Sequence, residues 1–506
     1  MQRASVLALL LGISSVCSII VQDAANWNAA HYWGGGIGAC AKILTAPNGE
    51  IFCGAKDGSI RKFPSITSSE NDAVLVWQAQ GDLTSTWGDR GMLGLAIDPN
   101  YPTSPYLWVL MSVRRLESPT TDANVLPNSC DAGDGGSMNA GAACDQAARL
   151  YRLRVTGNTA AIDQLLMYGW CSNGLSHHIG NLDWARDGGL YVSGGDGASY
   201  TNPDRGTPGQ PCHRDGDTRF QGAWRSQWDD YTHGKVFYLS REALYGNALV
   251  TIGNGARIVA KGLRNPFRFA IHPITHDLYV GDVGSDFFEE IDIIPDPLTN
   301  TNVPNFGWPC FEGNVAQPSF GADAGCADVA KVHTRPFIAY SRTRGFSVEG
   351  AQDHCMRGTV SAAAFMFMNS SDWGSKYQNR LFWADSSMQC IFVLANDDKG
   401  LPSADTTKMQ LLAYNGPTAT DGQIVGLMFA GTGANTALYA LDFYSSQVIK
   451  VTYSGDKSID PSVVVATPGT TGTGSGSKST SKSSALTATL SAVIAGCFVL
   501  AFYSAL

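Results

Sequence analysis

The stretch His276–Ile294, HDLYVGDVGSDFFEEIDII, shows the plan that decides the fold. A turn leads into an aromatic strand, a hairpin rich in Gly and Asp follows, and the stretch ends in a second strand rich in Ile. Short β-branched and aromatic runs between Gly and Asp turns indicate antiparallel strands. Five other stretches share this plan wholly or in part: Gly49–Phe63, Tyr106–Val113, Gly188–Gly197, Asn379–Ala395 and Thr436–Tyr453.

Six copies of one small sheet, without sustained helical periodicity between them, predict an all-β protein with the architecture of a six-bladed β-propeller. The copies recur at an irregular spacing of roughly 55 to 100 residues, so long loops must be inserted between strands. Two such loops are expected over residues 118–148 and 200–231. Loops on a rigid scaffold commonly carry function. On pattern alone, a large β-sandwich or a β-helix stays open as an alternative.

The composition is that of a globular protein, because 44% of the 506 residues are hydrophobic and 16% are charged. The formal net charge is −9, and Lys and Arg residues form no cluster along the sequence. Nucleic-acid phosphates need a basic surface. We therefore predict no nucleic-acid partner and favour a neutral or cationic substrate.

Both ends of the sequence have the composition of processing signals. Residues 1–18 place Arg3 before an apolar run, as in a secretory signal peptide. Residues 456–484 form a Ser/Thr/Gly-rich linker, and the hydrophobic residues 485–506 follow without a basic flank. This favours a GPI-anchor signal over a single transmembrane tail helix. We expect residues 19–455 to form the propeller of a secreted protein that a C-terminal lipid holds at the cell-surface membrane.

The cysteines also indicate export. There are twelve, of which Cys17 lies in the leader and Cys497 in the tail, so ten remain for the mature domain. In an oxidising compartment, ten cysteines predict up to five disulfides. A zinc site is disfavoured because the sequence contains no C-x-x-C pair. Neighbours in the sequence suggest the pairs Cys40/Cys53, Cys130/Cys144 and Cys310/Cys326.

Five segments, in order along the chain, resemble motifs of the glucose/sorbosone dehydrogenase family. This family includes soluble PQQ-dependent sugar dehydrogenases and Hedgehog-interacting-protein-like proteins. The strongest match is GLRNPFRFAIHP (Gly262–Pro273), which is similar to the family pattern G-x-R-N-P. The other four segments are Trp87–Tyr101, Ser176–Gly197, Leu278–Ile294 and Asn305–Gly313. The family's fold is a six-bladed propeller, in agreement with the six repeats.

The resemblance also implies an activity. In the family's enzymes, PQQ lies over the propeller axis, a calcium ion bridges cofactor and protein, and a histidine acts as base. We therefore expect an extracellular PQQ- and calcium-dependent oxidoreductase. It would oxidise the anomeric hydroxyl of an aldose or related sugar and pass the electrons to an external acceptor.

The resemblance places the catalytic base at His177, because Gly180 aligns with the second glycine of the family motif. His178 is adjacent, but neighbouring residues of a strand point to opposite faces, so only one of the two histidines is expected to face the site. An imidazole titrates near neutral pH and can accept the proton of a sugar hydroxyl.

The other implied site residues hold the cofactor and the metal. Asp89, Arg264 and Asn265 occupy positions that contact PQQ, where a guanidinium suits its carboxylates. The main-chain carbonyls of Gly284 and Ser285 occupy the positions of the calcium ligands, and calcium prefers oxygen ligands.

Some positions depart from the family pattern. Ser387 stands where the bacterial enzymes have a lysine, neutral residues around Gln423 replace arginines, and Ile179 replaces a glycine. These changes leave fewer cations for a tricarboxylate. A non-catalytic cell-surface propeller that binds a glycan or a protein, as in the Hedgehog-interacting-protein-like branch, is therefore the alternative function.

Overall fold

The computed structural model describes residues 27–455 except 35–36, 80–83, 85, 87, 114–145, 175, 200–202, 209–211, 343–360, 389, 415–422 and 444. The described residues belong to one compact unit, Met1–Val463, and a second unit, Val464–Leu506, lies outside them. The predicted leader, linker and hydrophobic tail also lie outside the described residues. Within the described ranges, no helix is both long and apolar enough to cross a membrane.

Blades 1 to 3 are built mainly from antiparallel strands. Blade 1 contains β2 (Cys40–Thr45), β3 (Ile51–Ala55), β4 (Ser59–Phe63) and β5 (Val74–Gln78). Blade 2 contains β6 (Met92–Ile97), β7 (Tyr106–Val113), β8 (Gln146–Thr156) and β9 (Thr159–Ser172). Blade 3 contains β10 (Leu182–Trp184), β11 (Leu190–Gly194), β12 (Lys235–Leu239) and β14 (Gly255–Lys261), with the short parallel strand β13 (Thr251–Ile252) at its edge.

Blades 4 to 6 complete the ring. Blade 4 contains β15 (Pro266–Ile271), β16 (Leu278–Asp282), β17 (Phe288–Ile294) and β20 (Ile338–Ser341). Blade 5 contains β21 (Ala362–Phe367), β22 (Leu381–Asp385), β23 (Cys390–Val393) and β24 (Gln410–Tyr414). Blade 6 contains β25 (Ile424–Ala430), β26 (Ala437–Asp442), β27 (Gln447–Tyr453) and β1 (Trp27–Trp33).

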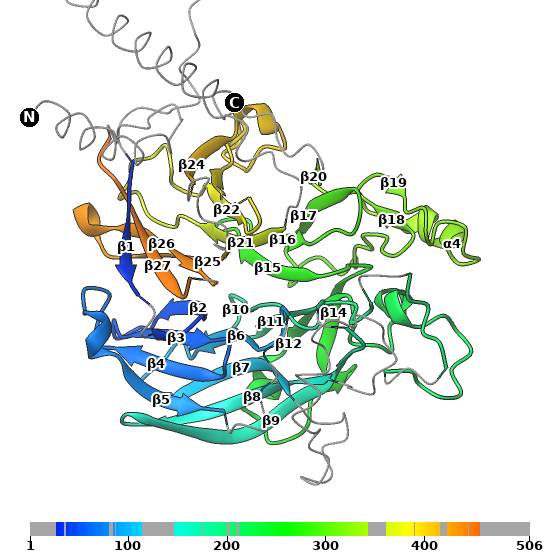
Figure 1. Cartoon of the computed structure of the whole chain (residues 1–506), viewed down its shortest axis with the longest axis horizontal. Coiled ribbons are helices and arrows are strands. Elements are labelled where there is room, and N and C mark those ends of the chain that lie inside the picture. The colour runs from blue at the N-terminus through cyan, green and yellow to red at the C-terminus, as the bar shows by residue number, and fades with distance from the viewer. Residues whose placement is uncertain are drawn as a thin grey trace, which may run out of the picture. The chain divides into compact units, whose positions relative to one another are not determined.

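The blades follow one another around a common axis in chain order, which confirms the predicted six-bladed propeller (Figure 1). The first strands of neighbouring blades contact one another, with β11 in place of β10 where blade 3 meets blade 4, and the ring closes where β2 meets β25. Each of the six repeated stretches supplies the second strand of its blade: β3, β7, β11, β16, β22 and β26. Because blades pack face to face, these strands are buried on both sides, β7 except at its first residue.

The N-terminal strand closes the ring. β1 pairs antiparallel with β27, so blade 6 joins the two ends of the propeller sequence. The Trp33 ring stacks on Phe63 of blade 1 at a centroid distance of 4.2 Å, and Tyr32 packs edge-on against Tyr439 of blade 6. β1 therefore holds the first and last blades together.

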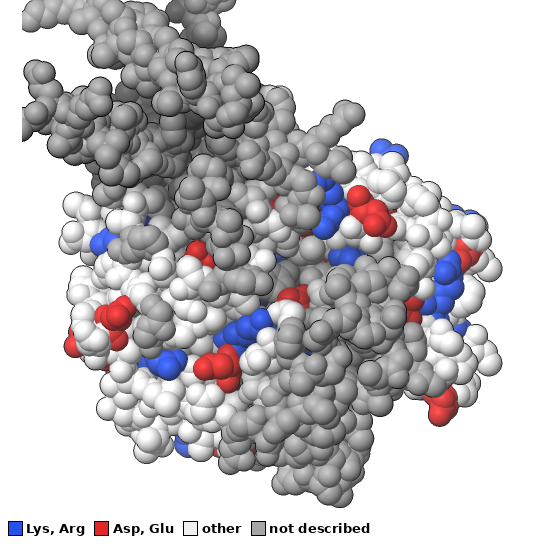
Figure 2. All heavy atoms as spheres, viewed as in Figure 1, with Lys and Arg blue, Asp and Glu red and all other residues white. Residues whose placement is uncertain are grey.

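Shorter elements lie between the strands. They are α3 (Arg241–Tyr245), α4 (Cys326–Val332), the hairpin β18 (Phe311–Glu312) and β19 (Val315–Ala316), and the 3-10 turns η3 (Glu70–Asp72), η4 (Gly222–Ser226), η6 (Thr406–Lys408) and η7 (Gly433–Asn435). The predicted loop of residues 118–148 lies mostly outside the described residues. On the described part of the face in Figure 2, acidic and basic side chains are interspersed among neutral ones.

The disulfides follow the sequence prediction where the structure describes them. Cys40–Cys53 and Cys310–Cys326 are bonded as predicted. A third bond, Cys171–Cys212, ties the loop after blade 3's second strand to the end of β9. The predicted pair Cys130/Cys144 lies outside the described residues.

One arginine, Arg268, joins the innermost segments of several blades. The guanidinium of Arg268, on β15, donates to the carbonyl oxygens of Ala41, Gly180, Phe267 and Val425 at 3.0 to 3.1 Å. These carbonyls belong to blades 1, 3, 4 and 6. Burial lowers the pKa of Arg268 to about 9. Among the described residues, its guanidinium is bound by carbonyl oxygens only, and it links four blades at the hub.

An aspartate at the end of the second strand recurs in three blades. Asp282, Asp385 and Asp442 accept hydrogen bonds from the backbone N–H groups of Asn265, Ser361 and Gln423, respectively. In each case the donor precedes the first strand of the same blade. The recurring aspartate thus fixes the segment that leads into the innermost strand.

Candidate active site

A pocket lined by both polar and apolar residues lies on the axis, at the end where the innermost strands begin. Its volume is about 310 Å³. The segments before the first strands of blades 2 to 6 all contribute to its wall, so only the closed ring assembles it. The lining residues are Gly88, Asp89, Ser176, Asn265, Phe267, Val283, Ser361, Ala363, Ser386, Ser387, Gln423, Val425 and Phe443.

A larger cavity, of about 590 Å³, lies on the outer edge of blade 3. Tyr238, Arg257 and Lys261 line it, together with residues of β13 and β14. None of the predicted site residues lines this cavity. We therefore take the axial pocket as the candidate active site.

Asp89 joins three segments of the pocket wall. Its Oδ2 atom accepts hydrogen bonds from Ser176 Oγ at 2.7 Å, from the backbone N–H of His177 at 3.0 Å and from Asn265 Nδ2 at 3.4 Å. The donors belong to the segments that lead into β10 and β15. A single carboxylate thereby sets the relative position of the predicted base and a predicted cofactor ligand.

His177 lies in a buried pair with Asp196. Its Nδ1 atom is 3.1 Å from Asp196 Oδ1, and the other carboxylate oxygen accepts a hydrogen bond from Trp308 Nε1 at 2.8 Å. Asp196 lies two residues after β11, whereas the recurring aspartates are the last residues of the second strands of their blades. In blade 3 the backbone N–H of His177 is bound by Asp89, so Asp196 holds the histidine ring instead.

The environment of His177 suits a neutral imidazole. The side chain is almost completely buried, and burial lowers its pKa, with a further decrease from the charge of Arg264. Asp196 opposes this change. With Asp196 ionised, Nδ1 carries the proton and the lone pair lies on Nε2, which is the tautomer of a general base.

His178 faces away from the pocket. Its Nδ1 atom is 3.0 Å from Ser112 Oγ, and its Nε2 atom is 3.3 Å from the carbonyl oxygen of Trp170. Burial lowers its pKa to about 3, so it is a neutral histidine of the core. Strand alternation, the reason predicted from the sequence, is wrong: neither histidine lies in a strand, and the φ of His177 is 58°.

Arg264 and Asn265 lie beside the pair. Their backbone N–H groups donate to the two oxygens of Asp282 at 2.9 and 2.6 Å, which positions both residues at the start of β15. Asn265 lines the pocket, whereas Arg264 lies behind its wall, with its guanidinium over the Trp308 ring. The structure therefore brings together all of the predicted cofactor residues.

The Gly284 carbonyl is held by two arginines. Its oxygen accepts hydrogen bonds from Arg264 Nη1 at 2.5 Å and from Arg342 Nη1 at 3.0 Å. A carbonyl oxygen has two lone pairs, so both are engaged. In this arrangement the predicted calcium ligand does not fit a calcium ion, and binding there requires both guanidinium groups to turn away.

Glu312 anchors the segment that contains Ser285, the other predicted calcium ligand. A single oxygen of Glu312, Oε1, accepts hydrogen bonds from four consecutive backbone N–H groups, 285 to 288, at 2.8 to 3.0 Å. Gly284 is required at the start of this turn, because a Cβ atom there would lie 1.5 Å from the carbonyl oxygen of Phe288. The turn is therefore built by its backbone rather than by its side chains.

Ser387 and Gln423 line the pocket, as neutral residues in place of the family's cations. Another cation lies nearby. Lys56, from the turn between β3 and β4, donates to the carbonyl oxygen of Gly88 and lies 4.8 Å from the centre of the Phe443 ring. Both partners line the pocket, so Lys56 supplies a positive charge from blade 1 that the sequence motifs did not indicate.

Sequence reasoning missed Asp196, Trp308, Glu312 and Lys56 as site residues. Asp196 carried a signal, because Asp-Gly follows an aromatic strand within a family motif. Trp308 and Glu312 also lie in a matched segment, NFGWPCFEG. No sequence motif indicated Lys56, because only the closure of the ring places blade 1 beside the pocket.

The fold and the site define a class: a propeller protein with a pocket on its axis and a buried histidine–aspartate pair that a carboxylate of the pocket wall holds in place. The family model described as Glucose / Sorbosone dehydrogenase matches residues 40–343, which is more than half of the chain. The chain therefore belongs to the glucose/sorbosone dehydrogenase family of oxidoreductases.

Solved structures share the fold at low sequence identity. A PQQ-bound aldose sugar dehydrogenase from Streptomyces coelicolor is 13% identical, with a TM-score of 0.52 and coverage of 85% of this chain and 99% of that one. The apo-form soluble aldose sugar dehydrogenase from Escherichia coli is 16% identical, with a TM-score of 0.53 and coverage of 85% and 100%. A calcium structure of a Trichoderma reesei protein of carbohydrate-active enzyme family AA12 is 13% identical, with a TM-score of 0.52 and coverage of 87% and 98%. No curated protein matches the sequence.

The pocket fits a polar cofactor such as PQQ. Among the described residues, Asp89 Oδ1, Asn265 Oδ1 and Arg264 Nε are buried without a hydrogen-bond partner. Buried polar atoms of this kind require a ligand or water. Asn265, Ser387 and Gln423 would hold the cofactor's polar atoms, and Arg264 and Lys56 would balance its carboxylates.

Proposed function

We propose that this chain is an extracellular PQQ-dependent dehydrogenase that oxidises the anomeric hydroxyl of an aldose or a related sugar. The observation that carries the proposal is the buried His177–Asp196 pair, which does not itself line the axial pocket but is joined to its wall by Asp89, the acceptor of the backbone N–H of His177. Membership of the glucose/sorbosone dehydrogenase family supports it. The PQQ-bound relative from Streptomyces coelicolor supports the choice of cofactor.

The chemistry divides between the cofactor and the chain. When bound, PQQ supplies a quinone that accepts a hydride from the anomeric carbon. His177 accepts the proton of the anomeric hydroxyl, so the C–O bond becomes the C=O of a lactone and the sugar loses two electrons. Asp196 holds the ring in the reactive tautomer and stabilises the imidazolium that forms. Because burial lowers the pKa of His177, the base is unprotonated at neutral pH.

The pocket wall would bind the sugar. Asp89 and Asn265 present buried acceptor oxygens without partners among the described residues, and sugar hydroxyls are donors. Asp89 also holds the backbone of His177. A hydroxyl bound by Asp89 would therefore be fixed relative to the base.

Calcium belongs to the proposal with Gly284 and Ser285 as its expected ligands, supported by the calcium structure of the Trichoderma reesei relative. In the present arrangement Arg264 and Arg342 bind the Gly284 oxygen. We therefore expect calcium to bind at this place only together with an anion that draws the guanidinium groups away. No proton transfer in the proposal depends on it.

Reconstitution tests the proposal. The purified chain is incubated with PQQ and calcium, and reduction of an artificial electron acceptor is followed with a panel of aldoses. His177→Ala should lower kcat at least 100-fold. The matched control, His276→Asn, changes a histidine in the turn between β15 and β16 and should leave activity unchanged. Full activity of His177→Ala would show that another group is the base.

The alternative is a non-catalytic cell-surface propeller that binds a glycan or a protein. The two guanidinium groups on the Gly284 oxygen and the neutral Ser387 and Gln423 favour it. In that case calorimetry would detect no PQQ binding, while a glycan array would detect a ligand. PQQ binding without turnover of any sugar would also favour this alternative.

We further propose that the protein is secreted and held at the cell surface by a C-terminal GPI anchor. Three disulfides among the described residues support export, because disulfides persist in oxidising compartments. Phosphatidylinositol-specific phospholipase treatment of intact cells should release the protein. Retention on the cells would contradict the anchor.

A further inference from the structure

Blade 5 contains the tripeptide Asn369-Ser370-Ser371 in the segment that joins β21 to β22. Asparagine, any residue except proline, and then serine or threonine form the acceptor sequence for N-linked glycosylation. No other tripeptide in the 506 residues has this pattern. Whether the pattern has a function depends on how the folded chain presents the asparagine.

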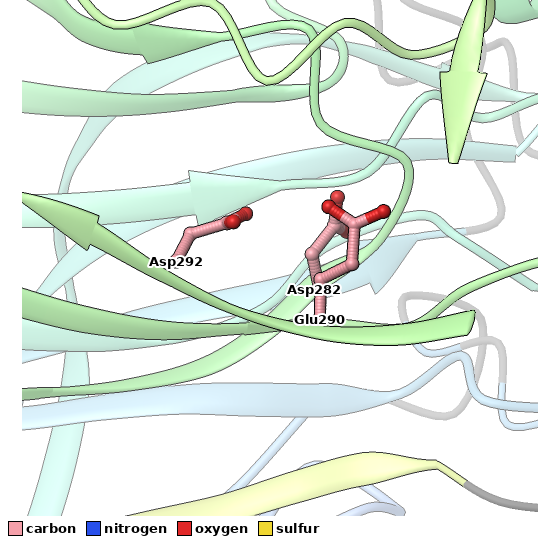
Figure 3. Close-up of side chains that lie close together, drawn as sticks. All are labelled: Asp282, Glu290 and Asp292. Atoms are coloured by element: carbon pink, nitrogen blue, oxygen red, sulfur yellow. The ribbon is translucent and has the colours of Figure 1, made fainter. Parts of the chain in front are cut away.

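The tripeptide lies at the surface. Asn369 and Ser371 are both exposed, and Asn369 forms no hydrogen bond with another described residue. An oligosaccharide on its amide nitrogen would therefore break no hydrogen bond among these residues. By contrast, polar side chains inside the blades are closed to solvent: the three acidic side chains in Figure 3, Asp282, Glu290 and Asp292, are all buried.

The residues on either side of the tripeptide are anchored in the fold. Met368 precedes it, is fully buried and donates its backbone N–H to the carbonyl oxygen of Arg380 at 3.2 Å. Trp373 follows it, is 1% exposed and donates its Nε1–H to the carbonyl oxygen of Thr436 at 3.0 Å. These contacts hold Asn369 at the surface in the folded chain.

Asn369 lies away from the axial pocket. The pocket is at the end of the axis where the innermost strands begin, and Ala363, near the start of β21, lines it. Asn369 comes two residues after the end of β21 and six residues after Ala363, which corresponds to about 20 Å of extended chain. A bulky group on Asn369 would therefore leave the mouth of the pocket open.

The last strand of the propeller ends on the same face as Asn369. β27 ends at Tyr453, whose ring lies 5.2 Å from the ring of Tyr377 in the segment between β21 and β22. The predicted linker of residues 456–484 follows this strand in the sequence. The face that contains the pocket is thus free of both the acceptor asparagine and the end of the propeller.

We propose that Asn369 carries an N-linked oligosaccharide on the face of the propeller opposite the axial pocket. The inference rests on the proposed export, because the transferase acts in the lumen of the secretory pathway. The donor is an oligosaccharide linked to a lipid diphosphate. Asn369 Nδ2 attacks its anomeric carbon, so that a C–N bond forms, the C–O bond to the diphosphate breaks, the amide loses one proton and the lipid diphosphate leaves.

The test translates the full chain in the presence of endoplasmic-reticulum microsomes. Chains that have entered the lumen are recognised by their resistance to added protease. The protected chain should migrate more slowly by one oligosaccharide. Digestion with peptide-N-glycosidase F should remove this shift and convert Asn369 to aspartate, which mass spectrometry of the peptide locates.

Three variants of the tripeptide sharpen the assignment. Asn369→Gln and Ser371→Ala should lose the shift, because the first lacks the acceptor amide of the motif and the second lacks its hydroxyl. The matched control, Ser370→Ala, should keep the shift, because the middle position accepts any residue except proline. Asn369 and Ser371 are exposed, so the first two variants are expected to fold as the wild type does.

A protease-protected wild-type chain without an oligosaccharide would overturn the site and leave the proposed export intact. An equal shift in the wild type and Asn369→Gln would overturn it as well. If the chain does not enter the lumen, the export proposal fails, and the full chain behind a secretory leader of another protein decides the site by the same two readouts. No PQQ or sugar substrate is used, so the proposed dehydrogenase activity does not affect the result.

Discussion

At the scale of single residues, the axial site depends on which hydrogen bond each aspartate makes. Asp89 binds the backbone N–H of His177, and this leaves Asp196 to bind the imidazole. In blades 4 to 6 an aspartate at the end of the second strand binds the backbone N–H before the first strand, whereas Asp196 binds the His177 ring and the backbone N–H of Ala198. An aspartate near the end of the second strand, which has a structural role in other blades, is thus part of the candidate catalytic pair in blade 3.

Asp196→Asn tests that pair. An amide can donate to Nδ1 and stabilise the wrong tautomer of His177, so we expect kcat to fall by about 100-fold or more while KM changes little. The loss of the carboxylate charge should also lower the pKa of His177 further. Steady-state kinetics over pH 5 to 9 measures both effects. Wild-type kcat in this variant would show that the pair is only structural.

His178 predicts a dependence of stability on pH. Its pKa is about 3 in the folded state and about 6.5 when unfolded, so the unfolded chain binds more protons between these values. The stabilisation of the folded state by the neutral His178 is present above about pH 6.5 and is lost as the pH falls toward 3. Between pH 7 and pH 5, the free energy of unfolding of His178→Gln should fall by roughly 1 kcal/mol less per pH unit than that of the wild type. Urea unfolding at the two pH values measures this difference. Parallel losses in the two proteins would contradict this assignment.

At the scale of elements, blades 2 to 6 each contribute a segment to the pocket wall, and the first strand of each blade lies nearest the hub. The hub strands are held together by Arg268, which has no carboxylate partner among the described residues and donates to carbonyls of four blades. Its position two residues after the Arg264-Asn265-Pro266 motif places the hub contact and the cofactor residues on one strand.

Arg268→Met removes these donors and leaves buried carbonyls without partners. Each buried hydrogen bond lost to a charged donor costs about 1.5 to 3 kcal/mol, so we expect the free energy of unfolding to fall by at least about 3 kcal/mol. Chemical denaturation measures the change, with Arg257→Met on β14 as the control. Arg257 donates a hydrogen bond to the carbonyl oxygen of Pro297, and its replacement should lower the free energy of unfolding far less. A similar loss in both variants would exclude a special role for the hub.

At the scale of the whole molecule, β1 decides whether the ring is closed. The strand pairs with β27, and Trp33 packs against blade 1. The pocket takes its wall from five blades, so its geometry depends on this closure.

Trp33→Ala tests the closure. Trp33 is 2% exposed, and truncating a buried tryptophan costs about 3 to 5 kcal/mol. We expect that loss in denaturant unfolding, together with weaker binding of any pocket ligand. Leu75→Ala, at a position on β5 that is 50% exposed, is the control and should change stability by less than about 1 kcal/mol. Equal losses in the two variants would show that the stacking of Trp33 does not hold the ring.

The sequence predicted the blades well because strands and turns are local. The six repeated stretches coincide with the six second strands, and two predicted disulfides join cysteines close in the sequence. It also predicted the region of the site, since motif residues such as Arg264 and Asn265 lie at the start of an innermost strand. The roles of His177, Arg264, Asn265, Asp89, Gly284 and Ser285 remain predictions.

By itself, then, the sequence determined the all-β architecture, the number of blades and the family, because alternating strands, turn residues and ordered motifs are properties of short segments. The tertiary structure alone decided that Asp196 binds His177, that Lys56 reaches the pocket from blade 1, and that two arginines bind the Gly284 oxygen. These contacts join segments that are distant along the chain. They depend on how side chains pack when the ring closes, and no local pattern of residues encodes that packing.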